Sequence, residues 1–198
     1  MPPITDISQL DLDKQYTYAD YLTWQLDGFV ELIRGKVRRM SPAPRRAHQE
    51  VLRNFARPIF NFLDDKPCKA YVAPFDVRLT KTTPNDDQQI TTVVQPDICA
   101  VCDLAKLDEQ GCVGAPDWII EILSPGNTVH DSKTKFDLYE ENGVTEYWMV
   151  NYGLKNIVVY VLENGRYQLR GEFFEPGPIP VYALSGLTLE WTDAFKGV

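Results

Sequence analysis

Two acidic residues stand in short apolar segments, at positions where a side chain is normally buried. Residues 98–101 and 118–123 are apolar runs bounded by Pro, Gly and Asp, which is the pattern of buried β-strands. Asp97 stands at the head of the first run, and Glu121 lies inside the second. Burying an unpaired carboxylate destabilises the fold or forces protonation. We therefore expect a cation or a dense hydrogen-bond network beside these two acids.

A lysine on the next predicted helix can supply a positive charge. The helix is predicted from Asp131 or Ser132, either of which can cap it, to about residue 141, where Asn-Gly ends it. Lys135 and Tyr139 share its inward side because they are one turn apart. The lysine stem can alternatively snorkel to water. Two acids and a lysine on neighbouring elements suit Mg²⁺ binding and stabilisation of a phosphoryl transition state.

A third candidate acid lies in a predicted hairpin near the N-terminus. Residues 29–33 and 36–40 alternate between apolar and polar, and Arg34-Gly35 joins them as a turn. Glu31 lies between apolar neighbours in the first run. A single Glu in a strand is more often at an edge or rim, so both interpretations stay open.

A long helix is predicted after the hairpin, from about residue 45 to 64, because apolar residues recur there at helical spacing. Pro58 should kink it. His48 lies on or beside the apolar stripe near the helix start. It is either a hydrogen-bonded core residue or a group that contacts the acids or a phosphate.

The charge of the chain is uneven along its length. The net charge of −8 is unusual for a nucleic-acid-binding protein, yet residues 34–57 carry eight basic residues against one acid, a local net charge of +7. The remainder of the chain carries −15. Such a segment can bind phosphates with salt-dependent affinity, or form a solvated basic face. Its basic residues are Arg34, Lys36, Arg38, Arg39, Arg45, Arg46, Arg53 and Arg57.

The four cysteines do not form a recognisable metal site. Cys99 and Cys102 form a C-x-x-C pair, but no second pair and no nearby histidine complete a zinc set. Residues three apart on a strand also point to opposite faces. We therefore predict that the cysteines are small apolar core residues.

The order of elements and the length define the class of protein. A chain of 198 residues is most simply one domain, here with residues 1–16 as a leader. Tyr18 begins a short predicted helix that ends near Leu26, after a capping box at Thr17. The pattern predicts an α/β or α+β fold, a mixed sheet flanked by helices. The chain contains neither a signal peptide nor a membrane span by sequence, so a cytoplasmic location is expected.

With these residues placed, the chain resembles the PD-(D/E)XK nuclease superfamily and, within it, the Uma-type family of restriction-endonuclease-like bacterial proteins. The resemblance extends from about residue 16 to residue 191. It depends on an ordered set of motifs rather than on Pro-Asp alone. These motifs are residues 30–37 (VELIRGKV), 40–44 (MSPAP), His48, Pro96-Asp97, 115–125 (APDWIIEILSP), Asp131 with Lys135 and Tyr139, and 143–148 (GVTEYW).

The resemblance implies a restriction-endonuclease-like core with an extra N-terminal helix and hairpin. Asp97 matches the metal-binding Asp of the superfamily, and Glu121 matches its (D/E) position. The lysine expected at position 123 is Leu123, and Lys135 matches the place on the following helix to which the Uma-type pattern moves it. Glu31 matches an acid from the N-terminal hairpin, and His48 a histidine on the first core helix.

The resemblance implies hydrolysis of DNA phosphodiester bonds with Mg²⁺ or Mn²⁺. Asp97, Glu121 and the carbonyl of Ile122 would hold the metal, with Glu31 and Lys135 also catalytic. His48, Asp131 and Tyr139 would support these residues. The predicted DNA-binding residues are Arg34, Lys36, Arg38, Arg45, Arg46 and Arg53, and a homodimer is expected.

Two other interpretations stay open. The first is a catalytically inactive nucleic-acid- or protein-binding module that keeps the nuclease fold. The second is a structural core in which Glu121 and Lys135 form an ordinary salt bridge. Cleavage that depends on a divalent metal and disappears in Asp97→Ala distinguishes the nuclease from both.

Overall fold

The computed structural model describes residues 3–40, 45–81, 86–124 and 129–198, and the side chains at positions 129 and 130 are outside this description. Residues 41–44 of the MSPAP motif, where the sequence indicates a break between the hairpin and the long helix, lie outside the described residues. The same holds for Pro125-Gly126-Asn127, which were expected to end a strand.

A six-stranded mixed sheet forms the centre of the molecule, in the order β12-β11-β10-β9-β6-β3. Only β9 and β10 are parallel among its neighbouring pairs, and α3 is the crossover between them. The predicted mixed sheet flanked by helices is therefore confirmed. The strands are β3 (Lys69–Val72), β6 (Ile98–Val101), β9 (Trp118–Leu123), β10 (Glu146–Asn151), β11 (Asn156–Glu163) and β12 (Arg166–Phe173).

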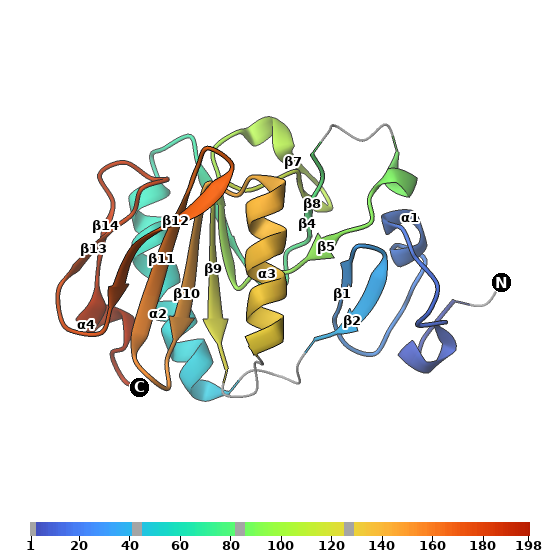
Figure 1. The fold of residues 1–198 in the computed structure, drawn as a ribbon, viewed down its shortest axis with the longest axis horizontal. Helices are drawn as coiled ribbons and strands as arrows, with labels where there is room; N and C mark the ends of the chain where they lie inside the picture. The colour runs from blue at the N-terminus through green and yellow to red at the C-terminus, as the bar shows by residue number, and fades with distance from the viewer. Residues whose placement is uncertain (1–2, 41–44, 82–85, 125–128) are drawn as a thin grey trace.

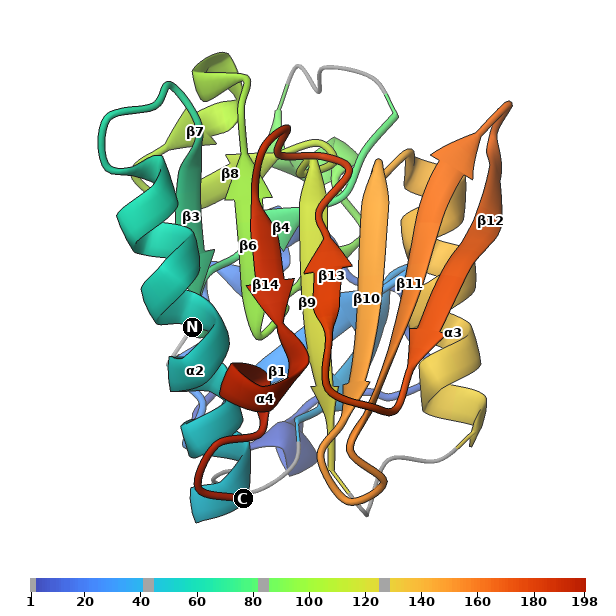
Figure 2. The same ribbon diagram turned by 90° about the vertical axis from the view of Figure 1, so that its left-hand side faces the viewer.

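Two layers of elements cover the faces of this sheet. Helix α3 (Val129–Asn142) lies on one face, as Figure 1 shows, and α2 (Arg46–Leu63) lies on the other. Figure 2 shows that the C-terminal elements share the α2 face. These are β13 (Pro178–Pro180), β14 (Thr188–Glu190) and α4 (Trp191–Ala194); β13 was missed in the sequence. Pro58 lies inside α2, and the kink expected there stays a prediction.

Alternation along the strands divides the core between the two faces. Trp118, Ile120 and Ile122 of β9 pack in the cluster that contains α2. Ile119 packs instead with Tyr139 and other residues of the α3 face. Each fully buried side chain of this size stabilises the fold by about 1.5–3 kcal/mol. Because side chains alternate, position 121 faces α3.

A second six-stranded sheet, ordered β2-β1-β5-β4-β8-β7, joins the N-terminal segment to the core. The predicted hairpin is confirmed, and its two turn residues Arg34 (φ 49°) and Gly35 (φ 78°) both have positive φ, as a tight hairpin turn requires. Its strands are β1 (Val30–Ile33), β2 (Lys36–Arg39), β4 (Val77–Arg78), β5 (Val93–Val94), β7 (Leu107–Asp108) and β8 (Gly111–Val113). The 3₁₀ helices are η1 (Ile7–Gln9), η2 (Asp87–Gln89) and η3 (Leu104–Lys106).

Two predicted helix boundaries are wrong. Helix α1 (Tyr18–Tyr21) begins at the predicted capping box but ends after one turn, because Trp24 leaves the helix to form a β-bridge with Ile4. Helix α3 begins at Val129, so Asp131 lies in its first turn instead of capping it.

The predicted leader is partly packed against the rest of the chain, because its residues Leu10 and Tyr16 are buried in the N-terminal hydrophobic cluster. In the described residues, no helix is both long and apolar enough to cross a membrane.

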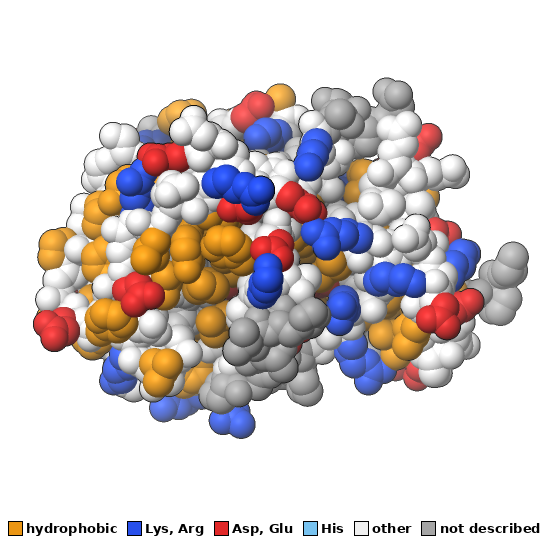
Figure 3. All heavy atoms as spheres, in the orientation of Figure 1, with side chains coloured by type: hydrophobic (Ala, Val, Ile, Leu, Met, Phe, Trp, Pro, Cys, Tyr) orange, Lys and Arg blue, Asp and Glu red, His pale blue; other side chains and the backbone are white. Residues whose placement is uncertain are grey.

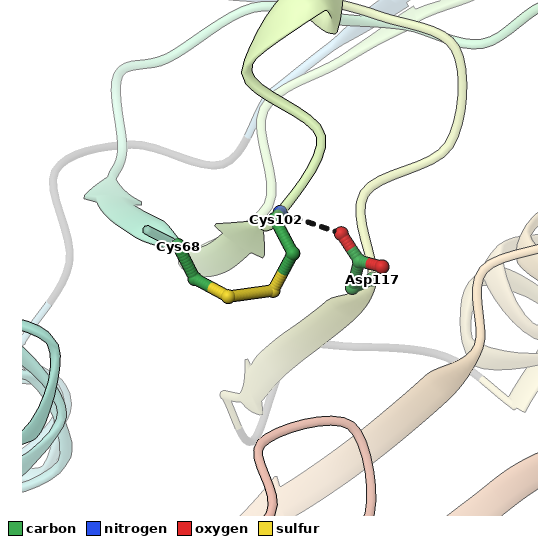
Figure 4. Close-up of a disulfide and its surroundings, with 3 residues drawn as sticks. All are labelled: Cys68, Cys102 and Asp117. Atoms are coloured by element: carbon green, nitrogen blue, oxygen red, sulfur yellow. Dashed lines mark hydrogen bonds between the residues drawn. A yellow bond between two sulfur atoms is a disulfide. The ribbon is translucent and has the colours of Figure 1, made fainter. Parts of the chain in front are cut away.

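Two of the four cysteines are bonded to each other, which corrects the prediction that all four are simple core residues. Strand β3 pairs with β6 so that Lys69 opposes Val101, and this register brings Cys68 and Cys102 together as a disulfide. The backbone N–H of Cys102 also donates to Asp117 Oδ2 over 2.7 Å (Figure 4). Cys99 and Cys112 are free and buried, as predicted.

The close contact between β8 and the segment before β4 requires glycine at position 111. Gly111 has φ +134°, and a Cβ there would lie 2.2 Å from the Asp76 carbonyl oxygen. We expect Gly111→Ala to lower the free energy of unfolding by about 2 kcal/mol through strain and overpacking. Urea denaturation measures the loss. Gly177→Ala is the control, because a Cβ there meets nothing within 4 Å, and an equal effect of both changes would contradict the explanation.

Glu146 is a fully buried acid at the start of β10 that connects the sheet to the C-terminal layer. It accepts hydrogen bonds from Trp148 Nε1 (2.6 Å) and from the backbone N–H of Ala183 (2.5 Å). Burial raises its pKa to about 7, although these hydrogen bonds oppose the rise. The group therefore stabilises the folded state fully below its ordinary pKa of 4.5, and this contribution is lost as the pH rises toward 7.

We expect Glu146→Gln to remove part of the pH dependence of stability. Between pH 4.5 and 8, the free energy of unfolding of the wild-type chain should fall by about 3 kcal/mol more than that of the variant. This amount corresponds to the difference between the ordinary pKa of Glu146 and its raised pKa in the folded state. Urea denaturation at several pH values measures both profiles. Parallel profiles would contradict the assignment of a raised pKa to Glu146.

Candidate active site

The two acids predicted from the sequence lie just beyond the paired residues of two adjacent strands. In the antiparallel β6–β9 pair, Ile98 opposes Ile120; Asp97 directly precedes Ile98, and Glu121 directly follows Ile120. The backbone N–H of Ile122 donates to Asp97 Oδ2 over 2.7 Å, which fixes the Asp97 side chain beside β9. Both acids are largely buried at the end of the β6–β9 pair, as the apolar runs around them predicted.

Lys135 and Tyr139 of α3 both contact Glu121. Lys135 Nζ lies 3.3 Å from Glu121 Oε1, and the Tyr139 hydroxyl donates to the same oxygen over 2.5 Å. The two side chains reach one acid because they are one helical turn apart. The sequence prediction that Lys135 faces inward is therefore confirmed by its position, and its side chain is only 17% exposed.

Glu31 enters the same group of residues from the other sheet. Its Oε1 accepts hydrogen bonds from Lys135 Nζ and, over 3.0 Å, from the backbone N–H of Gln95. Gln95 directly precedes Pro96-Asp97, so one short segment holds both Glu31 and the strand that carries Asp97. Lys135 thus bridges an acid of the N-terminal hairpin and an acid of the central sheet.

Burial and the neighbouring charges shift the pKa values of Glu121, Lys135 and Tyr139. Burial raises the pKa of Glu121 to about 7; the charge of Lys135 opposes this rise, and the charges of Asp97 and Glu31 add to it. Burial disfavours the charged form of Lys135, but Glu121 and Glu31 raise its pKa above the ordinary value. Burial also raises the pKa of Tyr139, so its hydroxyl remains a donor to Glu121.

His48 contacts Asp97 from the first core helix. Its Nε2 lies 3.3 Å from Asp97 Oδ1, and the residue is buried. Burial disfavours the charged imidazole, but Asp97 and the charge of Glu121 outweigh it and raise the pKa of His48. His48 therefore belongs with the acids, and the alternative that it is only a core residue is not favoured by this geometry.

These residues share a cavity of about 1150 Å³ with three arginines. Arg38 and Arg39 lie on β2, and Arg45 immediately precedes α2. The side chains of Arg38 and Arg45 form no ion pair within the parts of the chain that the structure describes. The cavity lining includes Glu31, Arg38, Arg39, Arg45, His48, Asp97, Glu121, Ile122, Asp131 and Lys135.

The other basic residues of segment 34–57 are less available to a ligand. Arg34 binds Glu141 of α3 over 2.9 Å. Lys36 Nζ contacts the backbone carbonyls of residues 12–14. Arg46 and Arg53 both pair with Glu50. Figure 3 shows Lys and Arg side chains gathered over the part of the molecule that carries β1 and β2.

A small polar network behind the site was not found in the sequence. Gln95 Nε2 donates to Asp76 Oδ1 over 2.7 Å, and the Tyr21 hydroxyl lies 3.4 Å from the same oxygen. The network holds the segment whose backbone binds Glu31. Gln95 was adjacent to Pro96-Asp97 in the sequence, but nothing local indicated its partners, which are 19 and 74 residues away.

Comparisons with known proteins show the family and the fold of the chain. A family model, Uma2, described as "Putative restriction endonuclease", matches residues 18–192. This chain belongs to the Uma2 family. The Uma2 chain is also similar in fold to a crystal structure described as "a putative nuclease belonging to DUF820", from Anabaena variabilis ATCC 29413. The TM-score is 0.70 and the identity 21%, over 91% of this chain and 97% of that chain. No curated protein matches the chain.

The site of this Uma2 chain fits a hard divalent cation in the kind of ligand it offers. Carboxylate and carbonyl oxygens, which Asp97, Glu121 and Ile122 supply, are the ligands that Mg²⁺ prefers. Among the described residues, however, no three His, Cys, Asp or Glu side chains are grouped so that they could hold a metal ion. Glu121 and Glu31 instead share the Lys135 ammonium as a partner.

Proposed function

We propose that this chain is a Mg²⁺- or Mn²⁺-dependent endonuclease that hydrolyses phosphodiester bonds in DNA with a single restriction-endonuclease-like domain. One observation carries the proposal. Asp97, which directly precedes β6, accepts a hydrogen bond from the Ile122 backbone beside Glu121 of β9, and the Lys135 ammonium lies 3.3 Å from Glu121, in a cavity that three arginines also line. The Uma2 family description supports the same class of reaction.

Each residue has a distinct task in this proposal. Asp97, Glu121 and the Ile122 carbonyl would hold the metal, which when bound lowers the pKa of a water ligand and neutralises phosphate charge. Lys135 stabilises the negative charge that develops on the phosphate. Tyr139 fixes the orientation of Glu121. The arginines of the cavity orient the DNA backbone.

Lys135 replaces the lysine that the superfamily motif places at position 123. Leu123 cannot supply a charge, but the Lys135 ammonium reaches the same acid from α3. This geometry supports the active nuclease over the inactive binding module. A simple salt bridge is an incomplete description of the site, since three carboxylates surround one lysine and one histidine.

The expected homodimer stays a prediction. Tyr147 and Trp148 of β10, whose apolar side chains could have formed its interface, are completely buried, and so is Ile157 of β11. Met149 of β10 and Val158, Tyr160 and Leu162 of β11 are only half-buried, so one face of these strands keeps accessible apolar side chains. Analytical ultracentrifugation of the purified chain measures the oligomeric state directly.

The direct test is incubation of the purified chain with supercoiled plasmid, linear duplex and single-stranded DNA. Cleavage with MgCl₂ or MnCl₂ that EDTA stops would support the nuclease. DNA binding without cleavage under all these conditions would support the inactive binding module instead. Neither binding nor cleavage would reject both proposals.

The free arginines predict a specific salt dependence of DNA binding. We expect the double variant Arg38→Gln/Arg45→Gln to reduce the slope of log affinity against log salt by about 2, because each phosphate contact contributes roughly 0.9. The measurement is fluorescence anisotropy of a short duplex in EDTA, where no cleavage intervenes. Arg46→Gln/Arg53→Gln is the matched control, because it removes two arginines that Glu50 already pairs. An equal change in both variants would contradict a specific phosphate path.

A further inference from the structure

Lys135 lies between Glu31 and Glu121, two acids that a bound metal ion could also contact. Its ammonium donates to Glu31 Oε1 and lies 3.3 Å from Glu121 Oε1, and all three side chains are at least four-fifths buried. Tyr139 adds a further contact at 3.4 Å from the ammonium. The ammonium is therefore enclosed by its partners, and little of its charge is exposed to solvent.

An ammonium and a divalent cation compete for the same carboxylate. Both gain energy by neutralising Glu121, and both gain more in a buried site, where charges are poorly screened. Two cations that share one carboxylate in such a site repel each other. Metal binding at Glu121 must therefore weaken the contact of Lys135 with this acid.

Glu31 gives Lys135 a second partner within the same site. Glu31 comes from β1 of the other sheet, and the backbone of Gln95 holds it in place. An ammonium that leaves Glu121 can thus stay neutralised and buried. A lysine without this second acid would have to lose its ion pair completely when the metal enters.

We propose that Lys135 is a built-in counter-cation that a divalent metal displaces from Glu121, and that Glu31 retains the displaced ammonium in the site. This inference rests on the proposed function, because it assumes that Glu121 binds the metal. It assigns Glu31 the role of a positioning residue for Lys135 instead of a metal ligand. It also explains why Glu31 and Glu121 converge on the ammonium, while the described residues contain no group of three metal-ligating side chains.

The test compares Mn²⁺ binding by the wild-type chain and by the double variant Lys135→Met/Glu31→Gln, using isothermal titration calorimetry. The double change removes one positive and one negative charge, so the net charge of the site is unchanged. Replacing both members of a buried ion pair is also compatible with folding. We expect the variant to bind Mn²⁺ about ten-fold or more tightly, because the competing ammonium is gone. Titrations at pH 8 and pH 9 limit competition from protons on Glu121.

Two further variants make the result specific. Lys133→Met removes a lysine from the same helix, one that pairs with Asp137 at the surface, and should leave the affinity unchanged. Glu121→Gln should abolish the binding of Mn²⁺ in both the wild-type and the double-variant background. Binding that survives Glu121→Gln would overturn the inference, because the metal would be elsewhere.

The outcomes separate this inference from the proposed function. Unchanged or weaker Mn²⁺ binding by the double variant, with clear binding by the wild type, would overturn the displacement of Lys135 and leave the nuclease proposal intact. No Mn²⁺ binding by either protein, with or without a short DNA duplex, would overturn both. Tighter binding that the Lys133 control does not reproduce would support the inference.

Discussion

Replacing Asp97 by Asn is expected to lower metal-dependent DNA cleavage by more than about 100-fold. Loss of a residue that merely supports a metal ligand reduces activity or affinity by roughly 10- to 100-fold, so loss of a ligand itself should exceed this range. The amide of the Asp97→Asn variant keeps an oxygen that can accept the hydrogen bond from the Ile122 backbone. The fold should therefore persist while the negative charge is lost. Initial rates of plasmid nicking at saturating Mg²⁺ measure the effect.

Asp137→Asn is the matched control for this change. Asp137 lies on α3 and pairs with Lys133 at the surface, so the variant removes the same charge outside the cavity. Its cleavage rate should equal that of the wild type. Residual activity of Asp97→Asn within about five-fold of the wild-type rate would contradict the assignment of Asp97. Thermal unfolding of both variants checks that neither has lost its fold.

Three residues of the candidate site could be found in the sequence because each one contradicts its local pattern. Asp97 stands at the head of an apolar strand, Glu121 lies inside another, and Lys135 stands on the inward side of a helix. Burial of such groups has a large free-energy cost without partners, so each one indicated the presence of the others. The hairpin at Arg34-Gly35 was equally clear, because its turn requires positive φ.

The parts that could not be predicted depend on contacts between residues far apart in the chain. Arg34 pairs with Glu141, which is 107 residues away, so its charge seemed available in the sequence. The early end of α1 depends on the bridge between Trp24 and Ile4, which no helix signal reports. Glu31 was ambiguous for the same reason, since only the tertiary structure brings it to Lys135. Local patterns identify the unusual residues, and the tertiary structure decides their partners.

The disulfide is the other feature with a large expected effect on stability. Cys68 and Cys102 are 34 residues apart, and closing a loop of this length restricts the unfolded chain. The chain-entropy model gives a contribution of about 4 kcal/mol. We expect the double variant Cys68→Ser/Cys102→Ser to lose about this free energy of unfolding. Guanidinium denaturation of oxidised protein measures the difference.

Reduction of the wild-type protein is an independent way to remove the same bond. Dithiothreitol should lower the stability of the wild type to nearly that of the double variant, and should leave the double variant unchanged. A loss of stability in both proteins would contradict the explanation, because the double variant has no disulfide to reduce: its remaining cysteines, Cys99 and Cys112, are free.

The disulfide also bears on the expected cytoplasmic location, because reducing compartments keep most thiols unbonded. Alkylation of thiols at the moment of cell lysis, followed by mass spectrometry, measures its state in the cell. A fully bonded pair would contradict that location, and a reduced pair would mean that the protein acts in cells without this stabilisation.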